Sequence, residues 1–182
     1  LTQGKIITGF NRVHILNTLP AASTPGNNSS FVEGTLKRAF AASGGAYDFP
    51  VGTSLKGYQR INMNFGSSND RSNAEVWFSN TALAIPAPLL GPECISAVYD
   101  QVPLDNGYWN VVPAPATGTA AYSVTAYNNN FTNPQSGFTI MSRFNAGAWG
   151  LNGVCDPASV ITAVQRTGLA VMANPSHFAT AQ

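Results

Sequence analysis

The sequence predicts an all-β fold, an antiparallel β-sandwich or jelly-roll-like domain with about ten short strands. Three observations predict it. Glycine (17) and proline (12) recur too often in the 182 residues for a long helix to persist. Short runs of alternating apolar and polar residues recur along the chain. Charged residues make up only 9% of it, so Asn, Ser and Thr must supply most of the polar surface.

The first strand signals lie in the N-terminal third. Residues 5–8 and 12–16 are two short β-rich runs, and residues 31–40 form a longer run. Gly34 lies inside that run, where a glycine often marks a bulge. Lys37 and Arg38, an adjacent basic pair, are expected on a solvated strand face.

The segment from Ala46 to Gly52 joins an aromatic strand end to a Pro/Gly turn, and Tyr58 and Arg60 follow it closely. Three later runs alternate between apolar and polar side chains, at residues 59–65, 74–80 and 122–126. In the first, Ile61, Met63 and Phe65 are expected on one face.

In the second alternating run, Val76 and Phe78 oppose Trp77. Further strands are expected at residues 138–144, 169–173 and 177–181. Residues 157–164 carry a helix-start signal, because Asp156 precedes a proline. Their β-branched side chains nevertheless favour a strand. With no clean boundary or repeat, residues 1–182 are predicted to form one domain.

The two cysteines, Cys94 and Cys155, have neither the Cys-x-x-Cys nor the Cys/His spacing of a zinc site. In an oxidising compartment we expect them to form a disulfide. The alternative is a pair of buried free thiols. A second metal candidate, residues 67–73, offers oxygen ligands but few acids, so a hairpin turn is favoured over calcium binding and no metal site is predicted.

No catalytic signature is present, so an enzyme is not expected and no cofactor is predicted. The chain has no Gly-x-Ser-x-Gly elbow, and its histidines, His14 and His177, lie far apart in strand-like contexts. The carboxylates of Glu93, Asp100 and Asp105 could form a glycosidase pair, but solvated loops explain them better.

Several partner classes are also disfavoured. The net charge is +1 and Lys and Arg do not cluster, so nucleic acid is not an expected partner. No apolar run reaches the ~20 residues of a membrane-spanning helix, so membrane insertion is not expected. Trp77 and Tyr99 could instead form a stacking platform for glycans, although aromatic side chains in a β-protein are more often core.

An ordered set of motifs spans nearly the whole chain. It comprises Leu1-Thr2-Gln3-Gly4-Lys5-Ile6-Ile7-Thr8, Ser30-Phe31-Val32-Glu33-Gly34-Thr35-Leu36, Phe49-Pro50-Val51-Gly52, Gly107-Tyr108-Trp109, Gln165-Arg166-Thr167-Gly168-Leu169 and Ser176-His177-Phe178-Ala179. This set resembles the all-β modules of Bacteroidetes surface proteins exported by the type IX secretion system. The resemblance implies an extracellular or cell-surface location. It also implies a scaffolding or adhesive role, and a C-terminal sorting domain that once followed Gln182.

The leading functional hypothesis is a non-enzymatic structural protein, a subunit of a surface filament or adhesive fibre. Residues 1–16 would donate a strand to a neighbouring copy, head to tail, or to another surface component. The donor side chains would be Lys5, Ile6, Ile7, Val13, Ile15 and Leu16. The C-terminal strand at residues 177–181 is a second candidate donor, and pairing within one molecule stays open. The alternative is a carbohydrate-binding or adhesin module.

Overall fold

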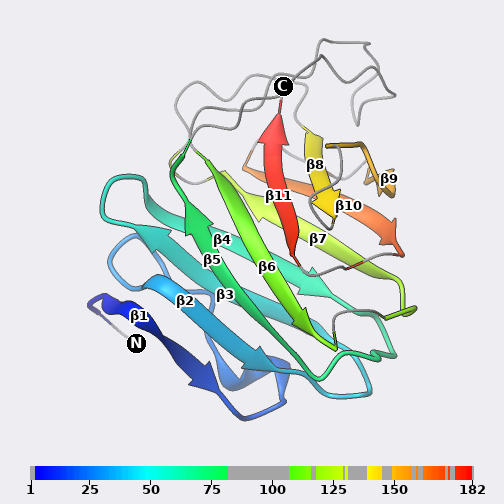
Figure 1. The fold of residues 1–182 in the computed structure, drawn as a ribbon, viewed down its shortest axis with the longest axis horizontal. Helices are drawn as coiled ribbons and strands as arrows, with labels where there is room; N and C mark the ends of the chain where they lie inside the picture. Colours follow the sequence, from blue (N-terminus) through cyan, green and yellow to red (C-terminus); the bar gives the residue numbers. More distant parts are fainter. Residues whose placement is uncertain are drawn as a thin grey trace.

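The computed structural model describes residues 3–81, 107–115, 118–128, 130, 139–144, 149–156, 159, 162–170, 172 and 175–181 (Figure 1). Its elements are β1 (Ile6–Ile15), the 3₁₀ helix η1 (Pro20–Ala22), β2 (Val32–Ala39), β3 (Ala46–Thr53), β4 (Gly57–Asn64), β5 (Asn73–Ser79), β6 (Tyr108–Ala114), β7 (Tyr122–Tyr127), β8 (Thr139–Phe144), β9 (Val154–Cys155), β10 (Ala163–Leu169) and β11 (Ser176–Ala181). The predicted all-β class is confirmed. Over these residues, no helix is long and apolar enough to cross a membrane.

The strands form one continuous sheet in the order β8-β11-β6-β5-β2-β3-β4-β7-β10-β9, and β1 pairs with β2 outside this path. Most pairings are antiparallel. Two are parallel, β1 with β2 and β2 with β3, so the sheet is mixed rather than purely antiparallel. β2 pairs with β3 near its start and with β5 over its second half, so the two layers diverge from this strand.

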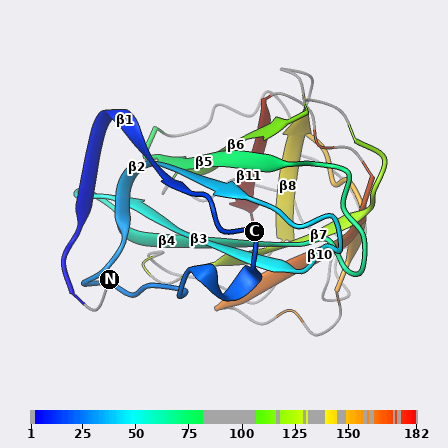
Figure 2. The same ribbon diagram turned by 90° about the horizontal axis from the view of Figure 1, so that it is seen from below.

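The curled sheet encloses the hydrophobic core between two layers (Figure 2). β5, β6, β11 and β8 form one layer, and β3, β4, β7 and β10 form the other. Both layers contribute side chains with almost no exposure to solvent, among them Val76, Trp109, Phe178, Phe49 and Val124. The Trp109 indole N–H of one layer donates to the Gln59 carbonyl of the other at 3.3 Å.

The alternating runs fold as their patterns predict. Ile61, Met63 and Phe65 are all buried at the core, the first two on β4 and the third just after it. On β5, Val76 and Phe78 point into the core while Trp77 lies partly buried on the opposite face. The period of two therefore identified the inner faces of these strands correctly.

Other boundaries differ from the prediction. β1 continues through Gly9 instead of breaking into two runs. β3 continues through Pro50 and Gly52, and the chain turns only at residues 54–56. β2 pairs with β3 only at Val51 and Gly52, so β3 can accommodate the preceding proline, which lacks an N–H.

The predicted strand at residues 169–173 is wrong at the described residues after Leu169: β10 ends there, residues 170 and 172 are not in a strand, and residues 171 and 173 lie outside the described residues. β6 was missed altogether. Residues 157, 158, 160 and 161, where helix and strand signals competed, lie outside the described residues. Arg38 does not lie on a solvated face: its side chain is 0% exposed and points inward between hydrogen-bond acceptors.

Candidate functional site

β1 has only one strand neighbour in the part of the chain that the structure describes. It runs parallel to β2 with Ile6 opposite Val32 and Ile15 opposite Arg38. No described strand pairs with its other side. The backbone N–H and C=O groups on that side of an edge strand are available for pairing with another chain.

A bulge interrupts the β1–β2 ladder. The register passes from Ile7 opposite Glu33 to Arg12 opposite Thr35, so residues 8–11 face Gly34 alone. The hydroxyl of Thr8 accepts the N–H of Thr35 at 3.1 Å and so replaces a backbone acceptor. Gly34 has φ +118°, and a Cβ there would lie 2.0 Å from the Thr8 hydroxyl oxygen. Gly34 is therefore required by both its backbone and its neighbour.

The same segment concentrates exposed apolar side chains. Six large hydrophobic residues are exposed among the described residues, and four of them lie between positions 7 and 19: Ile7, Phe10, Leu16 and Leu19. Phe10 stands at the bulge with its ring fully in solvent. Single exposed apolar residues are ordinary, but four of them on an edge strand and in the few residues after it point to an interaction surface.

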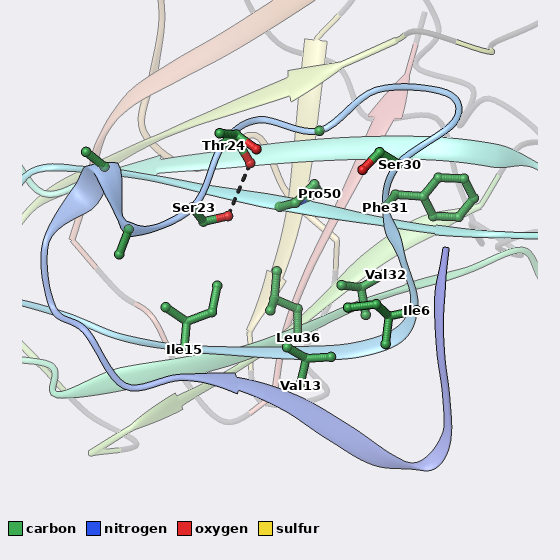
Figure 3. Close-up of a pocket in the computed structure, with 13 residues that line it drawn as sticks. Ile6, Val13, Ile15, Ser23, Thr24, Ser30, Phe31, Val32, Leu36 and Pro50 are labelled. Atoms are coloured by element: carbon green, nitrogen blue, oxygen red, sulfur yellow. Dashed lines mark hydrogen bonds between the residues drawn. The ribbon is translucent and has the colours of Figure 1, made fainter. Parts of the chain in front are cut away.

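An apolar cavity of about 260 Å³ lies between β1, β2 and the segment that carries η1 (Figure 3). Ile6, Val13 and Ile15 of β1 line it on one side. Its other walls come from Ala21, Ala22, Ser23, Thr24, Gly26, Ser30, Phe31, Val32, Leu36 and Pro50. The Ser23 hydroxyl donates to the Thr24 carbonyl at 3.1 Å, so this polar group is satisfied locally. The cavity thus lies directly under the inner face of β1.

Arg38 fixes the chain immediately after β1. Its guanidinium donates to the carbonyls of Asp48 and Pro20, each at 2.9 Å, and to that of Leu19 at 3.3 Å. It also lies 5.1 Å from the centre of the Tyr47 ring. Burial lowers the pKa of Arg38 from its ordinary value, and the negative charge of Asp48 opposes this effect.

Tyr47 also holds the chain that follows β1. Its buried hydroxyl accepts the Ala41 N–H at 2.9 Å and lies 3.0 Å from the Thr18 carbonyl and 3.1 Å from the Gly44 carbonyl. With Arg38, it holds the backbone of residues 18–20 against the body of the protein. The exposed residues 16–17 therefore connect β1, which has one open side, to residues 18–20, which Arg38 and Tyr47 hold in place.

The predicted donor residues all lie on β1 or next to it. Ile6, Val13 and Ile15 face the cavity, whereas Ile7 and Leu16 are exposed. The Lys5 ammonium lies 4.8 Å from the centre of the Phe31 ring. In this structure β1 pairs within its own molecule, and strand donation stays a prediction.

Sequence reasoning missed Phe10 and Thr8. The signal for them was the Gly-Phe-Asn interruption between the two β-rich runs, which the structure turns into the bulge.

The aromatic segment that begins at Ala46 is structural in its contacts. Phe49 and Val51 are 0% exposed in the core. Asp48 instead accepts hydrogen bonds on the outer face from Arg60 Nε at 2.7 Å and Asn62 Nδ2 at 2.9 Å. The Tyr58 hydroxyl donates to the carbonyl of Pro25. These contacts join β3, β4 and the loop before β2, and they bring no reactive groups together.

The proposed stacking residues do not form a described platform. Trp77 is partly buried on the outer face, and Tyr99 lies outside the described residues. Trp109 and Trp149 are buried. His177 packs edge-on against Tyr108 with 5.5 Å between ring centres.

The candidate calcium loop is held by its own hydrogen bonds. The Asn69 side chain bonds the Arg71 carbonyl at 2.7 Å and the Arg71 N–H at 3.0 Å. The Asp70 carboxylate accepts the N–H groups of Thr119 and Ala120, and these bonds lower its pKa. Its oxygens therefore serve to dock the neighbouring loop.

Cys155 lies on β9, and Cys94 lies outside the described residues, so the disulfide stays a prediction. The carboxylates of Glu93, Asp100 and Asp105 lie outside them as well. Within the described ranges, no three His, Cys, Asp or Glu side chains form a group that could hold a metal ion.

Comparison of the chain with protein families, curated proteins and solved structures found no match. The geometry of β1 and its surroundings therefore carries the functional argument.

Proposed function

We propose that this protein is a non-enzymatic extracellular structural subunit that assembles with copies of itself through β1. One observation carries the proposal: among the described residues β1 is an edge strand with one open side, and four exposed large apolar side chains lie on it or within four residues of its end. A second chain pairing along that side would supply backbone hydrogen bonds and cover apolar surface at the same time.

Among the described residues, β1 lacks several of the usual features that prevent such pairing. Natural edge strands are blunted by Lys, by Pro, by a covering segment or by a β-bulge. The bulge at residues 8–11 is the one such feature that β1 has, and it leaves the regular stretches at residues 6–7 and 12–15 on either side of it. β1 contains neither Lys nor Pro. Its one Lys or Arg side chain, Arg12, is engaged by Glu75 of β5. Little charge therefore opposes the approach of another apolar strand.

The contact between copies need not produce a closed dimer or ring. A strand edge that meets a different surface of the next copy repeats head to tail and yields a fibre. The resemblance to exported Bacteroidetes surface modules supports an extracellular or cell-surface location and passage through the type IX system. Other components of such a surface are further partners for the same edge.

The proposal is tested by placing a charge directly after the edge strand, at the exposed residue that follows Ile15. We expect the purified protein to associate as its concentration rises, as measured by sedimentation velocity, and to form fibres in electron micrographs. Leu16→Lys should weaken this association. Leu55→Lys is the matched control, because Leu16 and Leu55 are 74% and 75% exposed and Leu55 lies on the β3–β4 turn.

Two outcomes contradict the proposal. One is a protein that stays monomeric across a wide concentration range. The other is association that neither Leu16→Lys nor deletion of residues 1–16 weakens.

Glycan binding is the second candidate, favoured by the position of Trp77 on the outer face of β5, opposite Asn110 of β6. The Trp77 ring is only partly buried, so part of its apolar face can meet a sugar ring. A glycan array tests it with Trp77→Ala as the control. The absence of binding, or binding that the substitution leaves unchanged, contradicts it.

A further inference from the structure

We propose that the assembly is a strand exchange: β1 leaves its own β2 and takes the corresponding place along β2 of a second copy. This inference rests on the proposed function and specifies its partner surface. It differs from simple edge addition, in which β1 would keep its own β2 and use only its open side.

The place of β1 in its own molecule is incompletely filled. Val13 and Ile15 pack against the core but remain only partly buried, whereas core residues such as Val51 are 0% exposed. The apolar pocket beneath them, about 260 Å³, is partly open to solvent. Side chains that line it therefore face solvent on one side, where a core side chain would meet other protein atoms. Removing β1 therefore sacrifices fewer contacts than removing a well-packed core strand.

The structure also fixes where the exchange would pivot. Arg38 and Tyr47 bind the backbone carbonyls of residues 18–20. The Asn17 side chain accepts the Leu19 N–H at 2.9 Å and forms a turn directly before this fixed point. Leu16 and Asn17 are exposed, so the backbone can turn there without disturbing the anchor. The segment before Thr18, which includes β1, can then move as a unit away from the rest of the protein.

In a second copy, β2 offers the same edge for β1 to pair with, in the same register. Exchange of an identical element restores each contact that it breaks, because the donor sequence is unchanged. Val13 would again lie opposite Leu36, and His14 opposite Lys37. The Thr8 hydroxyl over Gly34 would set this register, since it supplies the acceptor for the Thr35 N–H. The exposed ring of Phe10 would remain available to pack at the junction between copies.

Cross-linking between two variants tests the exchange directly. Residues that pair across neighbouring strands lie about 4.8 Å apart, within the range that a disulfide spans. One copy carries His14→Cys and the other Lys37→Cys, and equal amounts are mixed under assembly conditions and then oxidised. We expect a covalent heterodimer joined through these two cysteines, identified by mass spectrometry. The matched control mixes His14→Cys with Leu55→Cys, which exchange does not bring together.

The double variant His14→Cys/Lys37→Cys provides the second measurement. Oxidised at high dilution, it locks β1 onto its own β2, and we expect it to remain monomeric until a reductant is added. Wild-type protein treated with the same reductant controls for Cys94 and Cys155. Exchange is overturned if the locked protein assembles as readily as the reduced one, or if the mixture gives no more cross-link than its control. Either result, with assembly of the wild type intact, leaves edge addition standing. A wild type that never assembles removes both proposals.

Discussion

Replacing Tyr47 by Phe removes one hydroxyl and the three contacts that it makes, two of which compete for its single proton. The hydroxyl accepts the Ala41 N–H and donates to the Thr18 or Gly44 carbonyl. Two hydrogen bonds at about 0.5–1.5 kcal/mol each give a loss of about 2 kcal/mol. For a chain of this length that corresponds to a fall in Tm of about 4–8 °C. Urea unfolding followed by tryptophan fluorescence measures the free energy directly.

Tyr58→Phe is the matched control for this prediction. The Tyr58 ring is also buried, but its hydroxyl donates one hydrogen bond, to the Pro25 carbonyl. We expect a loss of about 1 kcal/mol from Tyr58→Phe. If Tyr47→Phe costs no more than this, the hydroxyl of Tyr47 does not anchor the segment after β1, and the reasoning about the pivot is wrong as well.

Three other predictions concern single positions. Gly34→Ala should destabilise the fold by about 1–3 kcal/mol in urea, because it combines a strained φ with a collision at Thr8; unchanged stability would contradict the bulge geometry. The N–H of Thr119 lowers the pKa of Asp70, so this carboxylate stabilises the fold above about pH 4 and loses that effect as the pH falls. Asp70→Asn should therefore flatten the acid limb of the stability–pH curve. Burial raises the pKa of Tyr58 to about 12. The neutral phenol therefore makes its full contribution to the free energy of unfolding below about pH 10, and this contribution is lost as the pH rises towards 12. An ultraviolet titration should lose one late-ionising tyrosine in Tyr58→Phe.

The strands that face solvent on one side could be predicted from the sequence. Ile61, Met63, Val76 and Phe78 recur at every second position because one face of each strand meets the core and the other, which carries residues such as Asn62 and Trp77, does not. β6 escaped this reasoning because its pattern is irregular: Asn110 is nearly as buried as its apolar neighbours.

The position of β1 could not be predicted, because a strand's composition does not specify its neighbour. Residues 5–8 and 12–16 were predicted to be two short β-rich runs within a segment that donates a strand to a neighbouring copy. Its parallel pairing with β2, across a connection of 16 residues (16–31), depends on tertiary contacts, above all those of Arg38 and Tyr47. Arg38 was predicted to lie on the surface. Its hydrogen-bond acceptors are backbone carbonyls, and a sequence does not show which carbonyls lie near a side chain.

β2 belongs to both layers, since β3 continues one of them from its start and β5 the other from its end. Opening either layer from this strand disturbs the pairing of β2, so we expect the two layers to unfold together in one cooperative event. The amide protons of β2 should be among the slowest to exchange with deuterium. In a fibre, a pulling force on β1 would be transmitted to β2, and β2 would distribute it to both layers of the sheet.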